Sequence, residues 1–176
     1  MQLREATSVA HDRLDALLQQ SGWSTLDSYT RFLQIQYVAR RPIELWARAH
    51  CPANLLPPAQ SPLIANDLAA LGAMLPAAEE AFAMPPEADA IGLAWALAGS
   101  SLGNRVILRE IEHAGNRGWP LSFLSDQGMT GFWQKLRPQL EQSVGERESW
   151  AAGLAALAVF AHFSHCARMS NLELAA

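Results

Sequence analysis

Apolar residues recur at every third or fourth position along most of this chain, which is the spacing of one face of an α-helix. The clearest stripe lies within residues 3–19 and comprises Leu3, Thr7, Ala10, Leu14 and Leu17. The pair Ser21-Gly22 then interrupts the pattern. We therefore predict a first helix over residues 3–19 that buries one side against the rest of the molecule.

A second helix is predicted to begin near Ser24 or Thr25, because either hydroxyl can accept a hydrogen bond from the backbone at a helix start. Pro42 has no backbone N–H to donate within a helix, so the sequence predicts a kink or a break between Arg40 and Pro42. Residues 50–62 contain four prolines and are predicted to form an extended connector.

The same spacing predicts four more helices further along the chain, joined by short connectors. They cover residues 63–82, 88–115, 130–141 and 146–172. In the first of these, Leu68, Leu71 and Leu75 are expected to point inward, although Gly72 makes the course of that helix uncertain. Residues 119–128 are expected to be an irregular connector.

Composition changes this picture little, and it supports an all-α fold class. Ala and Leu dominate the chain, whereas Val, Ile and Thr, the residues that favour β-strands, are scarce. A chain of 176 residues with 17% charged residues is typical of one soluble globular domain, here residues 1–176. No uninterrupted apolar run of membrane-spanning length and no secretion signal is apparent, so a cytoplasmic location is expected.

Charge and cysteine content exclude further classes of protein and site. The net charge is −4 and the basic residues are scattered, which argues against a nucleic-acid surface. Cys51 and Cys166 belong to no paired metal-ligand motif, and both are expected to be free thiols.

Two glycines near the centre of the predicted helix over 88–115 need an explanation. Gly99 and Gly103 sit four positions apart, and each glycine inside a helix costs about 1 kcal/mol relative to alanine. Gly92 and Ala96 extend the same face towards the helix start. Close packing of two helices is the preferred interpretation of this stretch alone. The alternative is a flat ligand lying against bare backbone, with the helix bent at its glycine and serine residues.

The five histidines form no recognisable metal or hydrolase motif by themselves. There is no HExxH sequence, no nucleophile elbow, no phosphate-binding glycine loop and no dinucleotide fingerprint. His11 lies beside the apolar stripe of the first helix, and Arg4 lies two turns before it on the same side. A single helical histidine is most often a partly exposed, hydrogen-bonded side chain.

Two motifs taken together raise His11 above that interpretation. Residues 3–15 read LREATSVAHDRLD, which resembles the proximal-helix signature of heme oxygenases. Residues 99–106 read GSSLGNRV, which resembles the distal-helix glycine motif of the same family. Weaker similarity covers most of the chain between and beyond the motifs, and bacterial members encoded beside bacteriophytochromes look most similar.

The resemblance implies a multi-helix bundle with heme between the first helix and a glycine-kinked distal helix. His11 is then the iron ligand, and Gly99 and Gly103 let the distal backbone approach the heme face. The implied catalytic residues are Gly99, Ser100, Gly103 and Asn104. Backbone groups and ordered waters at this helix are expected to hydrogen-bond the bound dioxygen, and the Asn104 amide can crowd or hydrogen-bond the same ligand.

The heme propionates also need partners under this resemblance. Arg4 matches a basic position that can reach a propionate in the family. The last helix lacks the pair of basic residues that animal members use there, and His162, His165 or Arg168 are the candidates to replace them.

The implied activity is a heme-degrading monooxygenase that yields biliverdin, carbon monoxide and iron. Heme is both cofactor and substrate, dioxygen is consumed, and an external electron donor is required, either a donor protein or a small reductant. A bacteriophytochrome is the implied acceptor of the biliverdin. Neither nucleic acid nor a membrane is an expected partner.

Three departures from the family pattern keep a second interpretation open. Asn104 stands where a small residue is expected, Ser100 stands where animal enzymes carry an aspartate, and Ala94 replaces a tyrosine of some members. Asn104 and the missing propionate partners favour a heme-binding protein that stores or senses heme without cleaving it, whereas the serine at position 100 is a mild departure. A third interpretation is a structural helical module, or a relative that acts on another small ligand.

Overall fold

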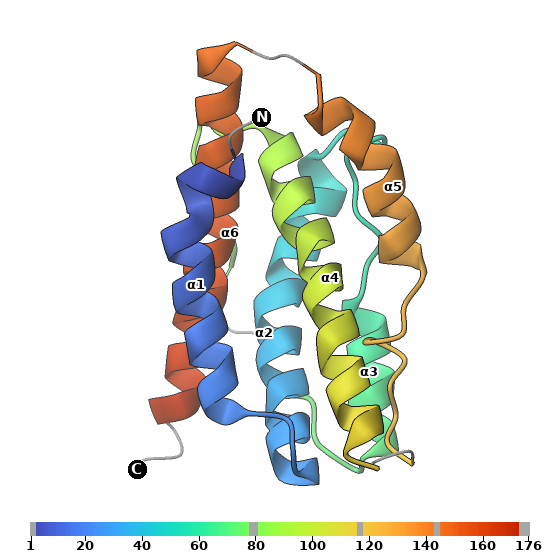
Figure 1. Ribbon diagram of the computed structural model, residues 1–176. Coiled ribbons are helices and arrows are strands. Elements are labelled where there is room, and N and C mark those ends of the chain that lie inside the picture. Colours follow the sequence, from blue (N-terminus) through green and yellow to red (C-terminus); the bar gives the residue numbers. More distant parts are fainter. Residues whose placement is uncertain (1–2, 78–80, 116–117, 143–144, 173–176) are drawn as a thin grey trace.

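The computed structural model describes residues 3–77, 81–115, 118–142 and 145–172. Within these ranges the chain is helical, with no β-strand, so the predicted all-α class is confirmed (Figure 1). The helices are α1 (Leu3–Ser21), α2 (Leu26–His50), α3 (Ser61–Ala70), α4 (Ala90–His113), α5 (Gly128–Leu140) and α6 (Glu146–Leu172). All but α3 lie close to where the apolar spacing predicts a helix.

The start of α2 follows the sequence prediction, whereas its course through Pro42 does not. The Thr25 hydroxyl accepts from the Ser28 backbone N–H at 3.2 Å, and the Ser28 hydroxyl accepts from the Thr25 N–H at 3.0 Å, which forms a capping box. The predicted break near Pro42 is wrong, because α2 continues to His50. Ala39 and Ile43 are fully buried on either side, so core packing compensates for the hydrogen bond that the proline cannot make.

The helix α3 is much shorter than predicted. It ends at Ala70, and Gly72 follows with a positive φ of 68°, the left-handed conformation that commonly terminates a helix. The Ala73 N–H returns to the Leu68 carbonyl at 3.0 Å and closes this end. Leu68 is buried as predicted, but Leu75 lies beyond the helix and is exposed, which corrects the expectation that it points inward.

The helices α1, α4 and α6 run in one direction and pack around a common core (Figure 1). The helix α6 packs against both α1 and α4, α2 runs antiparallel beside α6, and α5 covers α4. The main apolar cluster includes Leu14, Ile43, Leu97, Phe160 and Phe163 from α1, α2, α4 and α6. The first and last helices of the chain are therefore neighbours, and together with α4 they frame the candidate site.

From the sequence, no apolar run of membrane-spanning length is expected, whereas α4 and α6 each contain a segment that meets a criterion of length and composition. The segments Ala90–His113 and Glu146–Ser170 are long and apolar enough to cross a membrane by length and composition, with mean hydropathy of 1.2 and 1.3. In the most apolar 18-residue window of each segment, 44% and 56% of the residues are buried inside the protein. Because buried core helices of soluble proteins meet the same criterion, two such helices are weak evidence for membrane insertion.

Candidate functional site

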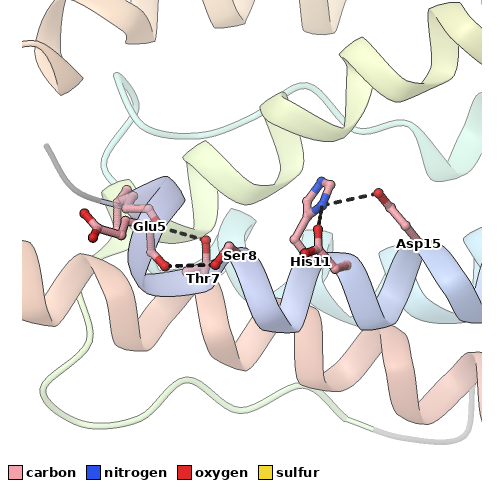
Figure 2. A network of polar contacts seen from close by, with 7 residues as sticks. Glu5, Thr7, Ser8, His11 and Asp15 are labelled. Atoms are coloured by element: carbon pink, nitrogen blue, oxygen red, sulfur yellow. Dashed lines mark hydrogen bonds and ion pairs between the residues drawn. The ribbon is translucent and has the colours of Figure 1, made fainter.

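The side chain of His11 is half exposed on α1 and contacts three other side chains. Its ring packs edge-to-face against Phe160 of α6, with 5.8 Å between the ring centroids. Its Nδ1 lies 3.3 Å from Asp15 Oδ2, one turn further along α1, and 3.7 Å from Asp12 Oδ1. Figure 2 shows His11 and Asp15 projecting from the same side of α1.

The contact with Asp15 has a chemical consequence for the imidazole. When Nδ1 carries the proton that this carboxylate accepts, the lone pair is on Nε2. Metal-ligating histidines usually have this arrangement, with one nitrogen on the metal and the other held by a carboxylate or carbonyl. Burial raises the pKa of Asp15, and the charge of a protonated His11 opposes that rise.

The small-residue face of α4 is closed in its first half. A Cβ added at Gly92 would lie 1.9 Å from the backbone oxygen of Ala152 on α6, a distance that no side chain can occupy. At Gly92 the interpretation as close helix packing is therefore confirmed.

The second half of the same face is open. A Cβ added at Gly99 or Gly103 would meet nothing within 4 Å, so the packing interpretation is wrong for these two glycines. Leu102 and Val106 flank them, and each is about half exposed. An exposed apolar surface beside bare backbone is suited to contact with a flat apolar ligand.

One aromatic side chain connects this face to His11. Phe160 contacts the His11 ring and also the Trp95 ring, at 6.2 Å between centroids. Trp95 precedes Gly99 by one turn of α4. Because one buried ring touches both partners, His11 and the open face of α4 lie on the same side of α6.

Ser100 points away from this open face and towards α2. Arg40 of α2 donates from Nη2 to Ser100 Oγ at 2.7 Å and from Nε to Gln36 Oε1 at 3.0 Å. The Ser100 hydroxyl donates in turn to the Leu97 carbonyl at 2.7 Å. Ser100 is thus part of a buried polar contact between α4 and α2.

Sequence reasoning did not select Arg40 as a functional residue. Arg40 is 1% exposed. Its spacing, three residues before Ile43 and four after Gln36, places this charged residue on the buried side of α2, and that spacing was the only feature of the sequence that could have indicated a role. Its guanidinium lies over the rings of Phe123 and Phe163, at 5.1 and 5.6 Å from their centroids. Its Nη1 has no hydrogen-bond partner among the residues described.

The charge of Arg40 is retained despite its burial. Burial lowers its pKa to about 10, and the charges of Glu44 and Asp126 oppose this change. A pKa near 10 keeps the group protonated at neutral pH. In the described part of the chain, no carboxylate forms an ion pair with it.

Asn104 and His162, two other residues predicted for the site, are directed away from it. Asn104 is buried, so its side chain does not project from that face. His162 follows Phe160 by two residues, about 200° around α6, and its ring packs against Phe82 at 5.5 Å. His162 therefore points away from His11.

Arg4 and Arg168 are both exposed, at opposite ends of the site. The helices α1 and α6 run in the same direction (Figure 1), and His11 is level with Phe160. At 1.5 Å per helical residue, Arg4 lies about 10 Å towards one end of His11 and Arg168 about 12 Å towards the other. The structure thus brings His11 and the glycine face together, and separates the two arginines.

A separate groove of about 590 Å³ lies between α2, α5 and the connector between α2 and α3. It is lined by Glu44, Arg48, Leu56, Pro57, Pro58, Ala59, Gln127, Gly128, Gly131, Phe132 and Lys135. None of the residues selected from the sequence contributes to this groove.

The chain matches no protein-family model, and no curated protein matches its sequence significantly.

Proposed function

We propose that this protein binds heme between α1 and the second half of α4, with His11 as the iron ligand, and cleaves the porphyrin ring. The products of the proposed reaction are biliverdin, carbon monoxide and iron, and it takes place in the cytoplasm. The all-helical fold alone does not indicate this function. Its support is the two sequence motifs and the arrangement of the residues within them.

The observation that carries the proposal is the pairing of an accessible imidazole with an open glycine face. His11 is half exposed, its Nδ1 faces Asp15, and its Nε2 is suited to bind iron. Gly99 and Gly103 leave space where other residues would carry a side chain. These features fit a flat, apolar, iron-containing ligand such as heme.

The roles of the protein follow from this arrangement. Heme supplies the iron chemistry with dioxygen and is also the molecule that is cleaved. His11 would hold and orient the macrocycle, and the bare backbone at Gly99 and Gly103 would leave space for it and for a small ligand. Leu102 and Val106 exclude water from the apolar face once it is covered. The electrons come from a ferredoxin, a flavoprotein reductase or a small reductant, and a bacteriophytochrome is the proposed acceptor of biliverdin.

A specific observation also favours a second candidate, a heme-binding protein that stores or senses heme without turnover. The hydroxyl of Ser100 is committed to Arg40 and Leu97, and the side chain of Asn104 is buried. Neither side chain is therefore directed at the open face, where a catalytic polar group would be needed.

One experiment separates these candidates. The purified protein is loaded anaerobically with hemin, then given reductant and air, and the pigment is identified by absorbance and chromatography. Biliverdin with equimolar carbon monoxide supports cleavage, whereas bound heme that survives supports the storage or sensing function. A protein that takes up no hemin contradicts both and leaves a structural or other ligand-binding role.

A further inference from the structure

Arg40 is a buried cation whose charge has no ion-pair partner within the part of the chain that the structure describes. Its hydrogen bonds go to two neutral oxygens, those of Gln36 and Ser100, and its Nη1 donates to none. Two aromatic rings, Phe123 and Phe163, take the place of water over the guanidinium. The charges of Glu44 and Asp126 offset part of the cost of burying this group, although neither forms an ion pair with it among the described residues. A further anion bound nearby would also be stabilised by the buried cation.

The position of this charge relates it to the candidate site. The guanidinium reaches Ser100, which lies between Gly99 and Gly103 in the sequence of α4. The side chains recorded over the guanidinium, Phe123 and Phe163, are buried and apolar. In such surroundings a charge is screened weakly, and its effect extends further than it would in water.

We propose that Arg40 selects for negatively charged ligands on the open face of α4, as a buried cation placed behind that face. This inference rests on the proposed binding of heme there. The ligand class is a small inorganic anion bound opposite His11, which the charge favours over a neutral ligand of similar size. Arg40 acts through its electrostatic field and does not touch the ligand, so it is a positioning residue and not a catalytic one.

The test compares an anionic and a neutral ligand on the heme-loaded protein. Azide is titrated into the ferric complex and carbon monoxide into the ferrous complex, each followed by absorbance. Arg40→Gln should lower azide affinity about tenfold, the order expected for one charge acting across a weakly screening interior, and change carbon monoxide affinity less than twofold. Arg40→Lys keeps the charge and should keep most of the azide affinity.

A matched control distinguishes this buried charge from any arginine near the site. Arg105 also lies on α4, but it is exposed and donates to the Thr130 hydroxyl of α5 at 3.1 Å. Because water and salt screen an exposed charge, Arg105→Gln should leave azide affinity unchanged. An Arg40→Gln variant that binds azide as the wild type does, or that loses both ligands equally, overturns the inference.

A second pair of variants leaves Arg40 in place, in case its replacement prevents folding. Ser100→Asp puts a carboxylate against Nη2 and neutralises the charge, so azide affinity should fall as it does in Arg40→Gln. Ser100→Asn adds no charge and should retain the affinity. Unchanged azide binding in Ser100→Asp would contradict the role of Arg40 but not the proposed heme binding. Failure of the wild-type protein to bind hemin would contradict both.

Discussion

At the scale of single residues, the availability of His11 as a ligand depends on a carboxylate one turn away. Asp15 Oδ2 lies 3.3 Å from Nδ1, and the edge contact with Phe160 fixes the plane of the ring. Together they hold the imidazole in an orientation that leaves Nε2 available as the proposed iron ligand. No comparable pair of contacts is described for His113, whose Nδ1 lies 2.6 Å from the carbonyl of Arg109.

Replacing His11 should remove the iron ligand and leave the fold intact. His11→Ala is expected to abolish the histidine-ligated heme spectrum, while far-UV circular dichroism stays close to that of the wild type because the side chain is half exposed. His113→Ala is the control, since it removes an exposed helical histidine far from the glycine face. A spectrum that is unchanged in His11→Ala would rule out this ligand.

The carboxylate of Asp15 should matter to hemin affinity, and that of Asp12 should not. Removing the partner of a ligating histidine typically costs about 10- to 100-fold in metal affinity, so Asp15→Ala should weaken hemin binding by this order. Asp12 makes the longer contact of 3.7 Å and its side chain is 82% exposed, so Asp12→Ala should have little effect. Equal losses in the two variants would mean that general charge, and not the contact to Nδ1, sets the affinity.

At the scale of elements, α4 carries one stripe of small residues with two different environments. Its first half, at Gly92, is closed by the backbone of α6, and its second half, at Gly99 and Gly103, is open. The two halves share residue type and helical face. They differ only because α4 and α6 lie close at one end and not at the other.

Substitutions in the two halves should therefore have opposite effects on stability. Gly92→Ala forces a methyl group into backbone and should lower the free energy of unfolding by about 1–3 kcal/mol or more. The Cβ of a leucine at position 103 meets no atom within 4 Å, and leucine is a better helix former than glycine, so Gly103→Leu should leave stability equal or up to about 1 kcal/mol higher.

The effect of Gly103→Leu on hemin binding and on biliverdin formation tests the proposed site directly. Hemin should still bind from the side of His11, whereas reductant and air should no longer yield biliverdin, because the added side chain fills the space above the ring. Chemical unfolding and the pigment assay are measured on the same preparations. Cleavage at the wild-type rate would place Gly103 outside the site.

Local pattern predicted most of the elements, and it failed where contacts distant in sequence decide the outcome. The capping residue Thr25 could be read directly from the sequence, because a cap depends on a few neighbouring residues. Pro42 remains inside a helix because buried neighbours hold it there, and α3 ends early because Gly72 adopts a positive φ. Neither fact follows from the apolar spacing, which Leu71 and Leu75 continue.

The candidate site shows the same limit. The role of His11 stays a prediction from its sequence motif, whereas the hydrogen bond between Arg40 and Ser100 joins residues 60 positions apart and has no local signature. Sequence also gave no means to tell that Gly92 is packed and Gly103 is open. Both depend on how two helices diverge, which is a property of the assembled bundle.

At the scale of the whole molecule, the first and last helices close the bundle against each other. The helix α6 contributes Phe160 to the site and Cys166 to the main apolar cluster, whereas Cys51 lies at the end of α2. The two cysteines are not joined by a disulfide.

The double variant Cys51→Ser, Cys166→Ser should accordingly keep the fold and hemin affinity. Cys166 is buried and its Sγ lies 3.8 Å from His162 Nε2, so a modest loss of stability is expected from placing a hydroxyl there. Thermal unfolding and hemin titration are the measurements. A large loss of hemin affinity would identify Cys166 as part of the site.

The shared direction of α1, α4 and α6 makes the two ends of the bundle electrically unequal. Each helix carries about half a positive charge at its first turn and about half a negative charge at its last. Arg4 lies in the first turn of α1, where the peptide dipoles add to its charge, whereas Arg168 lies near the negative end of α6. The carboxylates of a bound heme should therefore orient towards Arg4, and Arg4→Gln should speed hemin dissociation more than Arg168→Gln does.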